Sequence, residues 1–138
     1  MIKRDYYLDR LIHNMWNGEI KVITGIRRCG KSVLLFDLFY GYLISHNITD
    51  DHIIKLSLDQ RRYSKLRNPV VLCEHVENII KDHPEDQFYL FIDEVQFTRT
   101  VKDVANGDIE VTIYDMLNEL NAYKNLDVYV TGSISRML

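Results

Sequence analysis

The sequence has few of the residues that build a disulfide framework, a flexible linker or a membrane span. Its 138 residues include only two cysteines, two prolines and six glycines. The two cysteines have no CxxC or Cys/His spacing, which favours reduced thiols over disulfides or a zinc site. No apolar run is long enough to cross a bilayer, and residues 1–5 lack the apolar core of a signal peptide. We therefore expect a cytoplasmic protein without membrane contact.

The sequence also lacks an excess of charge of one sign. Lys and Arg number 17 and Asp and Glu 20, for a net charge of −3. This balance gives no global indication of nucleic-acid binding. The basic segment RRYSKLR at residues 61–67 keeps nucleic acid as an alternative partner, although a solvated loop explains it better. Without a Gly- or Pro-rich linker, residues 1–138 are expected to form a single domain.

Apolar segments of two kinds alternate along the chain. Short β-type runs predict strands, and runs with three- and four-residue spacing predict helices. Residues 98–110 are polar and contain Asn106-Gly107, which predicts a loop or a hairpin tip. The alternation predicts an α/β fold with a parallel sheet covered by helices on both faces. The strands are expected at 20–24, 53–58, 88–92 and 127–131, and the helices at 5–16, from 31, from 69 and at 113–123.

One strand-to-helix connection carries a phosphate-loop (Walker A) motif, G-x-x-x-x-G-K-[ST]. Its glycines let backbone N–H groups curl around a phosphate, and the following helix adds its positive end. Lys31 is expected to reach the β- and γ-phosphates, and the Ser32 hydroxyl to bind Mg²⁺. The expected nucleotide-binding residues are Gly25, Ile26, Arg27, Arg28, Cys29, Gly30, Lys31, Ser32 and Val33.

Two residues inside this motif leave alternatives open. Arg27 and Arg28 either contact a phosphate or point to solvent, because such loops bind mainly through the backbone.

No guanine-recognition motif of the Asn-Lys-x-Asp type is present. The expected ligand is therefore ATP together with Mg²⁺.

A second candidate element is the acidic end of the apolar strand at 88–92 (Walker B). Asp93 is expected to hold Mg²⁺ through water, and Glu94 to act as the general base that polarises the attacking water. Gln96 either contacts the metal-bound water or a neighbouring strand end. If the strand at 127–131 lies between the first and third strands, the hydroxyl of Thr131 or Ser133 comes near the γ-phosphate, and we count Ser133 as a catalytic candidate.

Three segments together resemble a known family. Residues 24–32, 92–96 and 131–133 resemble the AAA-like P-loop ATPases, in particular a prokaryotic family that carries a C-terminal restriction-nuclease-like domain. The resemblance implies a three-layer fold of the additional-strand, catalytic-glutamate type with sheet order 5-1-4-3-2. It also implies that this chain is an N-terminal fragment without the fifth strand. One departure is Ile134, where the family usually has Asn.

These features lead to competing hypotheses of function. The first is an ATPase that cleaves the β-γ phosphoanhydride. The second is a nucleotide-binding interaction module that is deficient in hydrolysis, which Ile134 and the missing C-terminal region favour. A small-molecule kinase is a weaker third. The resemblance places contacts with a second copy or a partner protein in the missing C-terminal region.

Overall fold

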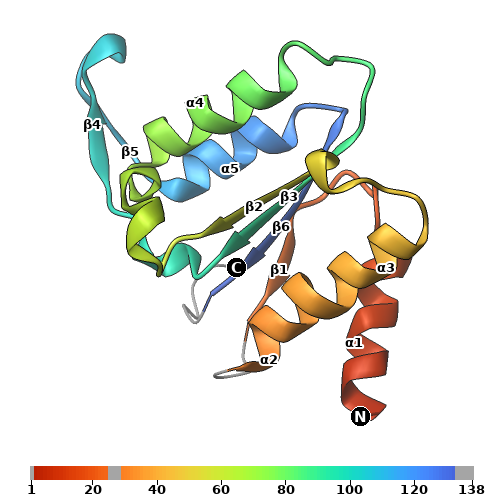
Figure 1. The fold of residues 1–138 in the computed structure, drawn as a ribbon. Coiled ribbons are helices and arrows are strands. Elements are labelled where there is room, and N and C mark those ends of the chain that lie inside the picture. The colour runs from red at the N-terminus through yellow and green to blue at the C-terminus, as the bar shows by residue number, and fades with distance from the viewer. Residues whose placement is uncertain (1, 25–28, 133–138) are drawn as a thin grey trace.

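The computed structural model describes residues 2–24 and 29–132, and its centre is a four-stranded sheet (Figure 1). The strands lie in the order β1-β6-β3-β2, and all neighbours are parallel. The predicted α/β class with a parallel sheet is confirmed. Because β6 lies between β1 and β3, it has the position on which the expected role of Thr131 or Ser133 depended. The bounds are β1 Lys21–Ile23, β2 Ile53–Ser57, β3 Phe88–Asp93 and β6 Leu126–Thr131.

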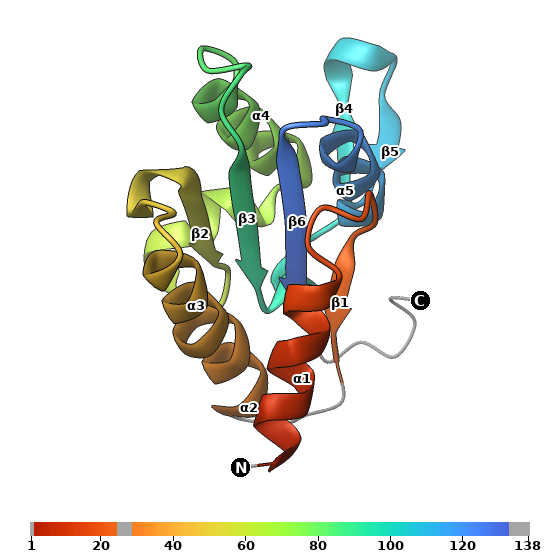
Figure 2. The same ribbon diagram turned by 90° about the vertical axis from the view of Figure 1, so that its right-hand side faces the viewer.

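Helices cover both faces of this sheet. In Figures 1 and 2, α4 and α5 lie on one face, whereas α1 and the helix that contains α2 and α3 lie on the other. Every residue of the two central strands, β3 and β6, is buried, as expected for strands covered on both faces. The helix bounds are α1 Ile2–His13, α2 Cys29–Ser32, α3 Tyr40–Ser45, α4 Pro69–Ile80 and α5 Ile113–Asn121.

Local sequence signals explain where α4 and α5 begin. The Asn68 side chain accepts hydrogen bonds from the N–H groups of Val70 and Val71, and Pro69 occupies the first helical position. At α5, the Thr112 side chain and that of Asp115 cap each other's backbone N–H groups. Both helices therefore start at residues that satisfy their free N–H groups.

The helix after the phosphate-loop motif departs from the regular α-helix expected from residue 31 onward. Val33–Phe39, between α2 and α3, is π-helical. The buried side chains Leu35, Phe39 and Leu43 are spaced by four residues. Leu35 and Phe39 lie in the π-helical segment and Leu43 in α3, and all three belong to the core on this face of the sheet.

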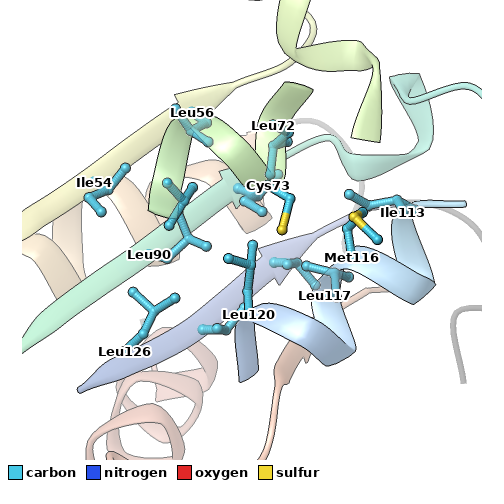
Figure 3. Close-up of a cluster of buried hydrophobic side chains, with 14 of the residues drawn as sticks. Ile54, Leu56, Leu72, Cys73, Leu90, Ile113, Met116, Leu117, Leu120 and Leu126 are labelled. Atoms are coloured by element: carbon cyan, nitrogen blue, oxygen red, sulfur yellow. The ribbon is translucent and has the colours of Figure 1, made fainter. Parts of the chain in front are cut away.

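The core on the α4/α5 face is mostly aliphatic (Figure 3). Alternate residues of the strands, such as Ile54, Leu90 and Leu126, point toward the two helices. The opposite core is rich in aromatic rings: Phe39 lies 4.8 Å from Tyr129 and 5.7 Å from Phe91, between ring centroids. The alternation of strand residues thus fills two separate cores, as a covered parallel sheet requires.

Two connecting segments have more local structure than a plain loop. Residues Arg61–Arg67 form 3-10 helical turns that stay largely exposed, and Arg67 donates from Nε to the Leu58 carbonyl oxygen at 2.7 Å. The hairpin predicted as one alternative for residues 98–110 is confirmed: β4 (Val101–Asp103) and β5 (Ile109–Val111) are antiparallel. Its turn includes Gly107 at φ 82°, a conformation that glycine adopts without strain. The remaining 3-10 turns are Asp50–His52, Val95–Phe97 and Val104–Asn106.

A buried ion pair joins β1 to β6 at the end of the sheet opposite the phosphate-loop motif. The Lys21 Nζ atom lies 2.5 Å from Asp127 Oδ1, and their side chains are 8% and 3% exposed. Asp127 Oδ2 accepts the Tyr129 hydroxyl at 2.6 Å and the Trp16 backbone N–H at 2.9 Å. Burial, followed by the nearby Asp127 carboxylate, raises the pKa of Tyr129. The Asp127 carboxylate therefore accepts from three donors, of which Lys21 and Tyr129 are buried.

We expect Asp127→Ala to cost about 3–5 kcal/mol of the free energy of unfolding, because it leaves the Lys21 ammonium buried without its counterion. Urea denaturation of the variant measures this loss. The matched control is Asp50→Asn, which breaks the exposed pair that Lys55 Nζ makes with Asp50 at 2.7 Å. Equal losses in the two variants would contradict a specific role for the buried pair.

Candidate nucleotide-binding site

The candidate site lies at the carboxyl end of the sheet. Helix α2 follows β1 there, and the ends of β3 and β6 lie beside each other because the strands are parallel. The backbone N–H of Gly132 donates to the Ile23 carbonyl oxygen at 3.2 Å, and that of Leu58 donates to the Asp93 carbonyl oxygen at 3.1 Å. The sheet therefore brings the residues after four different strands to one edge.

Lys31 and Ser32 occupy the first helical turn beyond β1, in α2. The Lys31 side chain is only 3% exposed. Among the described residues, no carboxylate lies within ion-pair distance of it, whereas the other buried lysine, Lys21, has Asp127. A buried ammonium without a counterion is costly, so this position is suited to an anion.

The Asp93 carboxylate links two of the expected elements. The Ser32 hydroxyl donates from Oγ to Asp93 Oδ2 at 2.8 Å. The other oxygen, Oδ1, accepts a hydrogen bond from the Thr131 hydroxyl. Asp93 is 6% exposed and Thr131 is fully buried. A hydroxyl and a carboxylate in direct contact form the kind of oxygen set that binds Mg²⁺, so the residues present fit that ion.

Thr131 also holds the residue that follows Asp93. The Glu94 backbone N–H donates to Thr131 Oγ1 at 2.9 Å. Glu94 has φ 59° and ψ 56°, a left-handed conformation that costs a residue other than glycine about 1–3 kcal/mol. The Thr131 hydroxyl therefore bridges the Asp93 carboxylate and a strained Glu94 backbone. Sequence reasoning offered Thr131 only as an alternative to Ser133, and the polar residue at the end of an apolar strand was its signal.

The Glu94 side chain is held within its own turn. Gln96 lies in the 3-10 turn Val95–Phe97 and donates from Nε2 to Glu94 Oε1 at 2.6 Å. Sequence reasoning had assigned Gln96 to a metal-bound water or to a neighbouring strand end. The structure adds a direct contact with the expected general base.

Several candidate residues carry no structural description. Gly25, Ile26, Arg27, Arg28, Ser133 and Ile134 lie outside the described residues. Cys29 and Gly30 lie in α2, and Val33 begins the π-helical segment. The site as described therefore consists of Lys31, Ser32, Asp93, Glu94 and Thr131, with Gln96 beside it.

The basic segment Arg61–Arg67 is adjacent to this edge of the sheet. Arg67 lies over the Phe97 ring, with 5.2 Å from its guanidinium carbon to the ring centroid, so it anchors the segment rather than facing a ligand. The Arg62 guanidinium carbon lies 5.1 Å from the Tyr63 ring centroid. Packing against aromatic rings therefore accounts for the positions of two of the four basic side chains, Arg62 and Arg67.

A second group of polar side chains lies between α4 and α5, away from the site. Ligand atoms of Cys73, Glu77 and Glu119 lie within 4.8 Å of one another, a cluster that the sequence spacing did not reveal. Burial, followed by the nearby glutamates, raises the pKa of the Cys73 thiol to about 12. The Tyr123 hydroxyl donates to Glu77 Oε2 at 2.6 Å. Without a bound cation, the thiol therefore stays protonated at neutral pH.

In the part of the chain that the structure describes, no helix is both long and apolar enough to cross a membrane.

Comparisons with known proteins agree with this geometry. Residues 17–138 match the model of an AAA domain family. An uncharacterized protein of Haemophilus influenzae is 29% identical over 141 residues, an alignment that covers 100% of this chain and 31% of that protein. A chain in the structure of Drosophila ORC bound to DNA has a TM-score of 0.60 at 12% identity, covering 97% of this chain and 78% of that chain.

The chain thus spans less than a third of the Haemophilus protein, and the ORC chain shares its fold. The family match covers most of the sequence and includes every described residue of the site. It supports an ATPase-type, nucleotide-binding function. This chain belongs to the AAA domain family.

Proposed function

We propose that the chain binds ATP and hydrolyses it in the presence of Mg²⁺. The observation that carries this proposal is Lys31, a residue only 3% exposed whose ammonium makes no ion pair with the described residues, next to the Ser32–Asp93 contact. An anion that also brings a divalent cation satisfies both features, and Mg²⁺-bound nucleotide is such a ligand.

Each residue then has a distinct role. Lys31 binds the β- and γ-phosphates, together with the backbone of residues 25–33. Ser32 and Asp93 hold Mg²⁺, which neutralises charge on the phosphate oxygens when it is bound. Glu94 takes a proton from the attacking water as general base. Thr131 fixes the relation between Asp93 and Glu94 through its hydroxyl, and Ser133 remains a candidate for holding that water.

The full parallel sheet is proposed to have the order 5-1-4-3-2. In this count of parallel strands, strands 1, 2, 3 and 4 are β1, β2, β3 and β6, and strand 5 is the additional strand. Among the described residues, β1 pairs on one side only, with β6. A groove of about 390 Å³ lies along its other side, between α1 and β1, and is lined by Arg10, Lys21 and Thr24 among others. An additional strand beside β1 would fill this groove. In this proposal residues 1–138 form one incomplete domain of a longer protein.

Two further parts of the proposal concern that longer protein. Because the Haemophilus relative is about three times as long as this chain, a C-terminal nuclease-like domain and contacts with a second copy or a partner protein are proposed for the remainder. The Drosophila ORC structure is a complex with DNA. For this chain, nucleic acid stays an alternative partner that the charge balance does not favour.

A nucleotide-binding interaction module without turnover is the second candidate function. Ile134 favours it, because the resembling family usually has Asn at this position and an apolar side chain cannot orient a water molecule. This alternative keeps every binding role above and removes only the chemical step.

Phosphate release from ATP separates these possibilities. We expect the wild-type chain to release phosphate when Mg²⁺ is present and to stop when EDTA removes the ion. Tight ATP binding without any release would favour the interaction module. Formation of ADP only when a hydroxyl acceptor is added, with the phosphoryl group transferred to that acceptor, would instead indicate a kinase.

A further inference from the structure

We propose that Gln96 is a positioning residue that fixes the carboxylate of Glu94 for hydrolysis. This inference rests on the proposed ATPase function. The contact that carries it is the hydrogen bond from Gln96 Nε2 to Glu94 Oε1, at 2.6 Å. It connects two side chains separated by one residue, Val95, which is 1% exposed and anchors the turn in the core.

The Glu94 backbone is already fixed by other contacts. Its N–H is bound by Thr131 Oγ1 at 2.9 Å, and its φ of 59° places it in the left-handed region. These contacts set the direction of the Cα–Cβ bond but leave the torsions of a long side chain free. A glutamate side chain loses rotamer freedom when it is ordered. The Gln96 amide supplies the contact that orders it before substrate arrives.

The hydrogen bond uses only one of the two carboxylate oxygens. Glu94 Oε2 accepts no hydrogen bond from any residue in the described ranges 2–24 and 29–132. The carboxylate can therefore accept a proton from water at Oε2 while Gln96 holds Oε1. An amide suits this role, because its N–H donates without carrying a charge that would neutralise the base.

A role of Gln96 in restraining Glu94 predicts the opposite change in the rate of hydrolysis. If Gln96 held Glu94 away from the attacking water, removing the amide would raise the rate of hydrolysis. Orientation predicts a lower rate, since misplacing a catalytic group by about 1 Å can cost on the order of 100-fold. The direction of the change in kcat therefore decides between the two.

The test compares Gln96→Met with the wild type. Methionine keeps the length of the side chain and removes the donor. We expect kcat for ATP hydrolysis to fall about 10- to 100-fold while the Kd for ATP stays within about twofold. In a Glu94→Gln background the same substitution should have no further effect on the residual rate, because both changes act through one carboxylate. Gln87→Met, at an exposed position before β3, is the matched control.

Two results would overturn the inference: an unchanged or higher kcat in Gln96→Met, or an equal fall in the Glu94→Gln background. If the wild type itself releases no phosphate, the proposed function fails, and the contact is still testable without turnover. The side-chain amide resonances of Gln96 are expected to shift in ¹⁵N spectra of Glu94→Ala, while those of Gln60 and Gln87 stay in place. Unshifted Gln96 resonances would show that the contact is absent.

Discussion

Replacing Lys31 by alanine is expected to weaken ATP binding by at least about 100-fold. Lys31 is only 3% exposed and its ammonium makes no ion pair with the described residues, so phosphate is its expected counterion. A charge-assisted contact in such a dry site is worth several times its value in water. Calorimetric titration of ATP in the presence of Mg²⁺ measures the loss directly.

The same substitution makes a second prediction that separates binding from folding. Without nucleotide, Lys31→Ala removes a buried charge that lacks a partner among residues 2–24 and 29–132, so we expect no loss in the free energy of unfolding. Lys55→Ala is the control for affinity, because Lys55 is paired with Asp50 on the surface. Unchanged ATP affinity in Lys31→Ala would contradict the phosphate role of Lys31.

Replacing Glu94 by glutamine is expected to slow phosphate release by orders of magnitude while ATP still binds. The substitution keeps the size of the side chain and an oxygen that can accept the Gln96 amide. It removes only the capacity to take a proton, and general-base catalysis contributes about 10²–10⁴-fold to a rate. We therefore expect kcat to fall within that range and the Kd for ATP to change little.

Glu85→Gln is a suitable control for this prediction, since Glu85 is exposed at the opposite end of β3. Both variants lose one negative charge. A difference in their rates of phosphate release therefore reflects the position of the carboxylate and not the net charge. Phosphate release at the wild-type rate in Glu94→Gln would rule out Glu94 as the base. Loss of ATP binding in the same variant would instead indicate that Glu94 holds the ligand.

The fold could be predicted because short apolar runs in the sequence mark its strands. The unbroken apolar run at residues 88–92 indicated a strand covered on both faces, and the structure buries every residue of β3. The phosphate-loop motif was recognisable from its position between a strand and a helix, and the structure confirms that context at β1 and α2. The helices expected from residue 69 and at 113–123 likewise form, as α4 and α5.

The features that sequence reasoning missed depend on contacts between distant residues. Thr131 meets Asp93 and Glu94 across 38 and 37 positions, and Lys21 meets Asp127 across 106. No local pattern reveals which strands become neighbours, so these contacts appear only when the sheet order is known. The left-handed backbone conformation of Glu94 was not predicted. Glutamate does not favour it, and the Thr131 hydroxyl that binds the Glu94 N–H lies far away in the sequence.

The basic segment shows the same limit on the surface. Four basic residues in seven predict a solvated loop, and the segment is largely exposed, but it forms 3-10 turns and Arg67 packs on Phe97. The hairpin at 101–111 was only one alternative for a polar stretch, and its strands follow from backbone pairing of Val101 with Val111 and Asp103 with Ile109. Polar composition indicated exposure in both cases but did not determine backbone conformation.

The most direct test of the Mg²⁺–ATP site is a calorimetric titration of the wild-type chain with ATP, with and without Mg²⁺. Because Lys31, Ser32 and Asp93 lie at one edge of the sheet, we predict one ATP per chain and a clearly lower Kd when Mg²⁺ is present. The absence of binding up to about 1 mM ATP, the upper end of ordinary substrate affinities, would contradict this account.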